Sequence, residues 1–275
     1  PQIIPTLATE ISYLDYNKIS RDKITKELNL ITKEYKDYIC FITQHDHASI
    51  ALDFFMCFHE DIVGELSQNE SLKYAIRNHD VGWIEYDKVP KVSDNREIYT
   101  FQNMKQSLQE ELWLKSIASS LNPYSQLLIA EHFKKLYLNS KSRKEESKFV
   151  DEANQILKNT FRKTTMPDVS NPTFTMELKF LQVCDLISLI ICRERDVDSN
   201  LVPTVYSFNK KEFNLKIEKI ADSAYKFAPG SFKSRSIILE IPYRMLESKL
   251  ILRPRQLKDE YKLQNTRFRK IELIC

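Results

Sequence analysis

The chain has 275 residues, 42% of them hydrophobic and 29% charged, as expected for a globular protein with a substantial buried core. Its 41 basic and 38 acidic side chains leave a net charge of +3, which gives no strong sign of nucleic-acid binding. With only three glycines, the chain carries no glycine-rich phosphate-binding loop.

The cysteines and the apolar runs indicate which cellular compartment to expect and whether the chain enters a membrane. Five cysteines, an odd number without a CxxC pair, favour a reducing compartment. The longest apolar run, residues 186–192, is far shorter than the roughly 20 residues that span a bilayer. Residues 1–10 show no signal peptide. We therefore predict a cytoplasmic protein that does not enter the membrane.

The predicted elements begin with a helix over residues 20–35 and a strand over residues 37–43, which are rich in β-branched and aromatic side chains. From residue 46 to about 195, apolar residues recur at helical spacing. This pattern predicts helices within 46–66, 71–83, 106–121, 122–138, 142–161 and 173–194.

The pattern changes after about residue 200. Short segments alternate between apolar and polar residues, as strands do, at 204–208, 213–220, 235–246 and 248–254. The sequence therefore predicts a mainly α fold. A helical bundle with an N-terminal extension would occupy residues 1–200, and a small β-rich C-terminal lobe, residues 201–275, would pack on it.

Five ionisable residues stand among apolar neighbours on four predicted helices. His47, His79 and His132 each fall on the apolar face of a separate helix, Asp80 follows His79, and Asp185 lies in an almost wholly apolar helix. Burying such groups is costly unless a partner satisfies them. If they converge, these mixed ligands suit a divalent ion such as manganese, iron, zinc, cobalt or magnesium.

Each residue also has a simpler interpretation. A single histidine on an apolar helix face is more often a core residue with a hydrogen-bond partner than a metal ligand. Asp185 could pair with a lysine or an arginine. The joint pattern, rather than any one residue, favours the metal hypothesis.

The order of these residues resembles the HD superfamily of metal-dependent phosphohydrolases: a histidine, then a His-Asp pair, then a distant aspartate, here His47, His79-Asp80 and Asp185. Several blocks, "ITQHDHA", "AIRNHDVGWIEYDKVP", "YTFQNM", "NPYSQLLIAEHFKKLY" and "LQVCDLISLIIC", resemble more closely an uncharacterised bacterial family, domain of unknown function three thousand eight hundred and ninety-one. The resemblance implies an HD-like helical fold over residues 40–195 and a metal site, but no substrate.

One position departs from the HD pattern. Many of those hydrolases carry a lysine shortly after the His-Asp pair, whereas this chain has Trp83 in "HDVGW". The long loop of residues 83–101 is a candidate pocket rim, with Trp83, Tyr86 and Lys88 as predicted substrate-binding residues. Lys91 and Arg77 are alternative cations for a phosphate group.

These observations lead to a metal-dependent hydrolase as the predicted function, acting on a small-molecule phosphate ester such as a nucleotide. Asp80 and His132 are the predicted catalytic residues, and His132 could instead be a further metal ligand. Two alternatives stay open: a di-iron oxygenase that uses the same ligand types, and a non-catalytic metal-containing binding or scaffold protein.

Overall fold

The fold is described from a computed structural model, which covers residues 31–275 apart from 94–95, 100–103, 140–146, 197–204 and 207–211. Its helices are α2 (Gln44–Cys57), α3 (Glu60–Val63), η1 (Gly64–Gln68), α4 (Glu70–Asn78), η2 (Val81–Trp83), α5 (Gln106–Ala118), α6 (Pro123–Leu138), α7 (Lys148–Thr160), α8 (Pro172–Arg193), η4 (Ser248–Leu252) and α9 (Pro254–Leu263). Its strands are β1 (Ile31–Glu34), β2 (Tyr38–Ile42), β3 (Val205–Tyr206), β4 (Glu212–Phe213), β5 (Glu218–Ala221), β6 (Ala224–Lys226), β7 (Ser236–Glu247) and β8 (Arg267–Ile274).

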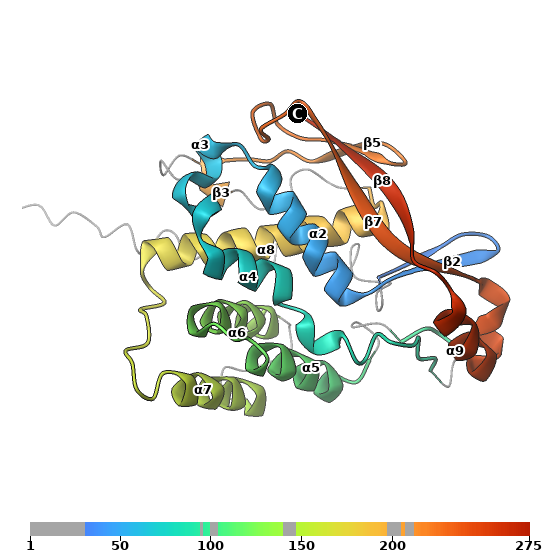
Figure 1. The fold of residues 1–275 in the computed structure, drawn as a ribbon, viewed down its shortest axis with the longest axis horizontal. Helices are drawn as coiled ribbons and strands as arrows, with labels where there is room; N and C mark the ends of the chain where they lie inside the picture. Colours follow the sequence, from blue (N-terminus) through green and yellow to red (C-terminus); the bar gives the residue numbers. More distant parts are fainter. Residues whose placement is uncertain (1–30, 94–95, 100–103, 140–146, 197–204, 207–211) are drawn as a thin grey trace, which may run out of the picture.

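Six of the strands form one mixed sheet in the order β1-β2-β7-β8-β6-β5. The pair β6–β8 is parallel, and the other neighbours are antiparallel. The long strand β7 pairs along most of its length with β8, while its last residues pair with β2, where Ile39 lies opposite Leu246. Figure 1 shows β7 and β8 as long, curved strands that run beside α2.

The predicted mainly α, HD-like helical bundle with a small β-rich C-terminal lobe is therefore wrong, because the fold is α+β. The sheet combines strands from residues 31–42 with strands from residues 218–274. Alternation along the chain marks a strand but does not reveal a partner 200 residues away, because pairing is decided by tertiary packing. Residues 31–34, predicted as the end of a helix, form β1, and residues 20–30 of that prediction lie outside the described residues.

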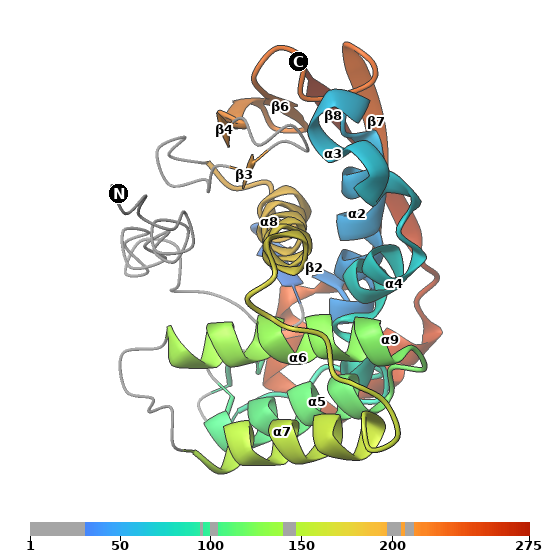
Figure 2. The same ribbon diagram turned by 90° about the vertical axis from the view of Figure 1, so that its left-hand side faces the viewer.

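Helices lie in all six ranges predicted between residues 46 and 194, but the range 46–66 is divided among α2, α3 and η1, and the range 71–83 between α4 and η2. The longest, α8, contacts α2, α4 and α6, and Figure 2 shows it end-on, beside α2 and above α6. Asn171 caps its N-terminus by accepting from the Thr173 backbone N–H, and Pro172 occupies the first turn. Because neighbours surround α8, nearly all of its faces are buried, which explains its almost continuous apolar sequence.

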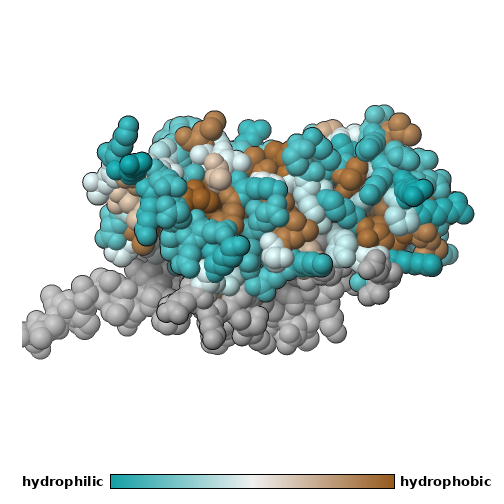
Figure 3. All heavy atoms as spheres, turned by 90° about the horizontal axis from the view of Figure 1, so that it is seen from below, coloured by the Kyte–Doolittle hydropathy of each residue, from teal (hydrophilic) through white to brown (hydrophobic). Residues whose placement is uncertain are grey.

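The molecular surface is of mixed character. The face shown in Figure 3 intersperses hydrophilic and hydrophobic residues. Within the part of the chain that the structure describes, no helix combines the length and the apolar character needed to cross a membrane.

Candidate metal centre

His47 is positioned by the first turn of α2. Thr43 caps this helix, because its hydroxyl accepts from the backbone N–H of Asp46. The His47 side chain is buried and faces α8. Its Nε2 lies 2.8 Å from Asp80 Oδ2 and 3.7 Å from Asp185 Oδ1.

The His79-Asp80 pair lies where α4 ends. The helix stops at Asn78, and Asp80 leaves helical geometry with φ −104° and ψ 22° before the short turn η2 begins. Consecutive residues in a continuous helix point about 100° apart, but the changed backbone at Asp80 lets both side chains turn inward. His79 Nε2 thereby comes within 3.6 Å of Asp80 Oδ2.

Gly82 holds this turn against α5. Its backbone N–H donates to the Ser116 hydroxyl at 2.9 Å. A Cβ at Gly82 would lie 2.6 Å from the Ser116 backbone nitrogen and closer still to the Leu112 carbonyl oxygen. The glycine in "HDVGW" is therefore required by the close approach of two backbones, and that approach fixes Asp80.

Two further helices complete the cluster. Asp185 in the middle of α8 places Oδ1 3.4 Å from His79 Nε2 and Oδ2 3.5 Å from His132 Nε2 on α6. His132 is fully buried, and neither of its ring nitrogens has a hydrogen-bond partner among the described residues. Asp80 and Asp185 keep a small exposed fraction.

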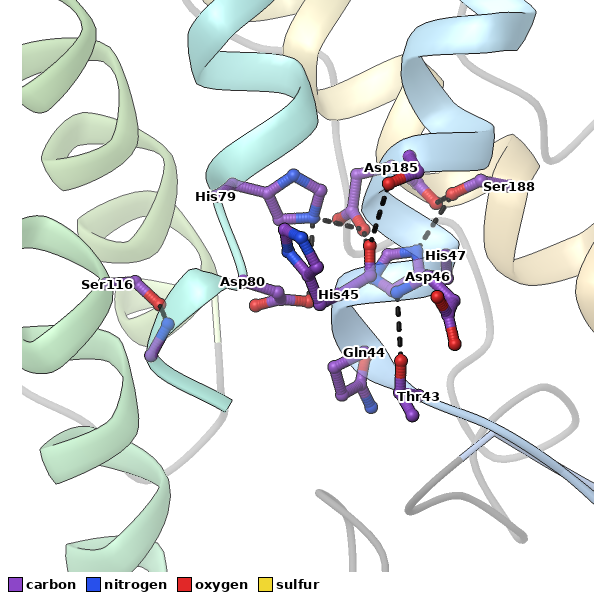
Figure 4. Close-up of polar contacts among 12 residues, drawn as sticks. Thr43, Gln44, His45, Asp46, His47, His79, Asp80, Ser116, Asp185 and Ser188 are labelled. Atoms are coloured by element: carbon purple, nitrogen blue, oxygen red, sulfur yellow. Dashed lines mark hydrogen bonds and ion pairs between the residues drawn. The ribbon is translucent and has the colours of Figure 1, made fainter. Parts of the chain in front are cut away.

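The structure thus brings together all five residues that the sequence singled out. Two groups of candidate metal ligands share His79: one adds His47 and Asp80, the other His132 and Asp185. In each group the ligand atoms lie within 4.8 Å of one another. Figure 4 shows the His47, His79, Asp80 and Asp185 side chains directed toward a common point between α2, α4 and α8.

The charges within the cluster are strongly coupled. Burial lowers the pKa of His79, but the carboxylates of Asp80 and Asp185 outweigh this effect and raise it to about 9. Burial by itself raises the pKa of Asp185, yet the hydrogen bond and charge of His79 hold that pKa well below its usual range. Burial lowers the pKa of His132 to about 4 and keeps this imidazole neutral.

The three predicted substrate-binding residues follow the cluster along the chain. Trp83 is buried against Met104 and Leu112, and its ring meets the Tyr86 ring edge-on at 5.8 Å. Lys88 is exposed and pairs with Glu85. Contact with a substrate stays a prediction for all three residues.

Other polar groups beside the cluster were not identified from the sequence. Ser188 on α8 contacts His47, and Asp87 accepts from the backbone N–H of Gln44 at 2.7 Å. Gln44 and Asp87 are both almost fully buried, although the sequence places them beside polar residues that suggest exposure. His45 is half-buried, and Figure 4 draws it near His79 and Asp80.

The fold and the site together define an α+β protein with a buried histidine–aspartate cluster that could hold a metal ion. The chain belongs to the family described as "Protein of unknown function (DUF3891)", whose model matches residues 30–248. That range includes all five residues of the cluster. The match confirms the resemblance to this family of unknown function that the sequence blocks indicated. No curated protein and no solved structure matches the chain.

Proposed function

We propose that this protein is a metal-dependent hydrolase that acts on a phosphate ester, such as a nucleotide. His47, His79, Asp80 and Asp185 would hold one or two divalent ions, with His132 as a further ligand or as an acid/base group. Mixed imidazole and carboxylate ligands favour manganese, iron, zinc or cobalt, and magnesium is a further candidate.

The main support for this proposal is the protonation state of His79, that is, which of its ring nitrogens holds a proton. Its Nδ1 lies 2.8 Å from the Ile76 carbonyl oxygen, which can only accept, so Nδ1 must carry the proton. In the neutral ring the Nε2 lone pair then faces two carboxylates, Asp80 and Asp185. Lone pairs that face one another in a buried site repel unless a cation lies between them. In the metal-free protein a second proton fills this role, which is why the His79 pKa rises.

The spacing of the ligand atoms suits a metal as well as a proton. Metal–ligand bonds of about 2.0–2.2 Å, at tetrahedral or octahedral angles, place neighbouring ligand atoms about 2.8–3.6 Å apart. The distances from His79 to Asp185 (3.4 Å), from His79 to Asp80 (3.6 Å) and from His132 to Asp185 (3.5 Å) fall in this range.

The residues themselves suggest how hydrolysis would proceed. When bound, the metal supplies Lewis acidity, which makes water a better nucleophile at neutral pH. Asp80 would orient that water and accept its proton, because its carboxylate is one of the two with an exposed fraction. His132, neutral and fully buried, would keep its Nε2 lone pair available throughout.

The order of His47, His79-Asp80 and Asp185 is that of the HD phosphohydrolases and favours phosphate-ester chemistry, but Trp83 replaces the lysine that many of those enzymes use. Lys91 does not compensate in this conformation, because its ammonium group donates to the Tyr86 carbonyl oxygen and lies over the Tyr86 ring. The missing lysine favours a second candidate, an iron-dependent oxygenase built on the same ligands.

Metal analysis of protein purified without a chelating tag tests the proposal first. We expect about one or two ions per chain, loss of metal in Asp185→Asn, and retention in Glu177→Gln. Glu177 is the matched control, because it is a buried carboxylate on the same helix that binds Asn69 and Tyr124 instead of the cluster.

Activity then distinguishes the two candidates. Hydrolysis of phosphate mono- or diesters that depends on added manganese, cobalt or magnesium under anaerobic conditions supports the hydrolase. Bound iron together with oxygen consumption, and no anaerobic hydrolysis, supports the oxygenase. A wild-type chain that binds no metal after soaking with manganese, iron and zinc refutes both.

A further inference from the structure

Ser188 connects two of the proposed metal ligands. It lies on α8, one turn after Asp185, and is completely buried. Its hydroxyl donates to the Asp185 backbone carbonyl oxygen at 2.8 Å and contacts His47 Nδ1 at 3.0 Å. Figure 4 shows Ser188 beside His47, on the side of the imidazole opposite Asp80.

The direction of these two hydrogen bonds follows from counting protons. A carbonyl oxygen has no proton to give, so the 2.8 Å contact with Asp185 uses the single proton of the Ser188 hydroxyl. The Ser188 oxygen can then only accept from His47, and His47 Nδ1 must carry a proton. In the neutral imidazole the lone pair is therefore on Nε2, the nitrogen that faces Asp80 and Asp185.

We infer that Ser188 is a positioning residue that fixes His47 in the one tautomer able to bind the metal through Nε2. The inference rests on the proposed metal centre and adds the group that orients one of its ligands. Metal-binding histidines are commonly oriented in this way by a hydrogen bond to their second ring nitrogen. Here the same hydroxyl also contacts the backbone of a second ligand, so it ties α2 to α8 at the centre.

The three histidines differ in the group that binds Nδ1 and so orients the ring. His79 is oriented by the Ile76 carbonyl oxygen, which belongs to its own helix. Nδ1 of His132 has no hydrogen-bond partner among the described residues. His47 depends on a side chain from another helix, so a single substitution can remove its orienting group and leave the backbone unchanged.

The test compares Ser188→Ala with Ser125→Ala. Ser125 is an equally buried helical serine, whose hydroxyl donates to the Ser71 backbone carbonyl oxygen rather than to any residue of the cluster. Affinities for Zn²⁺ and Mn²⁺ are measured by competition with a chelator. We expect Ser188→Ala to weaken both about 10- to 100-fold and Ser125→Ala to leave both within about twofold of wild type.

A spectroscopic readout separates orientation from a general loss of stability. In zinc-loaded protein labelled with ¹⁵N-histidine, the wild-type His47 resonances should show a protonated Nδ1 and a metal-bound Nε2. Ser188→Ala should lose the slowly exchanging Nδ1 proton. Ser188→Thr, which restores the hydroxyl, should recover both the proton and most of the affinity.

The outcomes divide clearly. Wild-type affinity in a folded Ser188→Ala protein, or a His47 ring bound through Nδ1 in the wild type, overturns the inference and leaves the metal centre intact. Equal losses in Ser188→Ala and Ser125→Ala overturn it too, because they indicate a packing effect. If wild-type protein binds neither metal, the proposed function fails together with the inference.

Discussion

Asp87 is a buried acid whose ionisation should make the stability of the fold depend on pH. One carboxylate oxygen accepts from the Gln44 backbone N–H at the start of α2, and the other has no hydrogen-bond partner among the described residues. Burial raises the pKa of Asp87 from 3.8 to about 7. Asp87→Asn removes the charge but keeps an oxygen that can accept from Gln44.

The size and sign of the effect follow from this pKa. Because the folded-state pKa lies above the unfolded one, the folded chain binds the proton more tightly between about pH 4 and pH 7. Stability therefore falls as the pH rises through this window and levels off above it. At about 1.4 kcal/mol per pH unit the full window is worth up to about 4 kcal/mol. The stability advantage of Asp87→Asn over wild type should be about 1.5 kcal/mol at pH 5 and about 4 kcal/mol at pH 8, so the advantage should grow by about 2.5 kcal/mol between the two pH values.

Urea denaturation of chelator-treated protein at the two pH values measures this difference. Asp222→Asn is the control, because its side chain is almost fully exposed and its effect on the free energy of unfolding should be the same at both pH values. A difference between Asp87→Asn and wild type that does not change from pH 5 to pH 8 would refute the argument from burial.

Three further outcomes are expected. Gly82→Ala should destabilise the fold by about 1–3 kcal/mol and lower the metal content, because the new methyl group meets the Leu112 and Ser116 backbone; calorimetry and metal analysis check this. Arg269→Met should cost about 1–3 kcal/mol in urea denaturation, because it removes one of two cationic partners of the buried Glu194 carboxylate and leaves Lys33 as the other. Metal at 100 times its Kd should stabilise the wild type by about 2.7 kcal/mol over chelator-treated protein, and Asp185→Asn should show no such gain.

The cluster could be predicted because the sequence makes it conspicuous. Asp185 has apolar residues on almost every side along the chain, and His47, His79 and His132 each interrupt an apolar stripe. Burial of such groups needs a common partner, and the structure gathers them into two groups that share His79, with the ligand atoms of each group within 4.8 Å of one another. The family match covers the same residues without adding a reaction, so their chemical roles stay a proposal.

Ser188 could not be predicted in the same way. A serine within an apolar helix is common, because its hydroxyl can donate to a carbonyl oxygen of the preceding turn. Its contact with His47 joins residues 141 positions apart and depends on how α2 and α8 pack. The pairing of Gln44 with Asp87 is equally invisible, because both lie among residues that look exposed.

The sequence by itself determined where helices form between residues 46 and 194 and that His47, His79, His132 and Asp185 fall on apolar faces, because helical periodicity is a local property of the chain. Only the tertiary structure decided that residues 31–42 join the C-terminal strands in one sheet and that the backbone turns at Asp80. Strand partners and turn geometry depend on contacts between distant segments, and these contacts leave no periodic signal in the sequence.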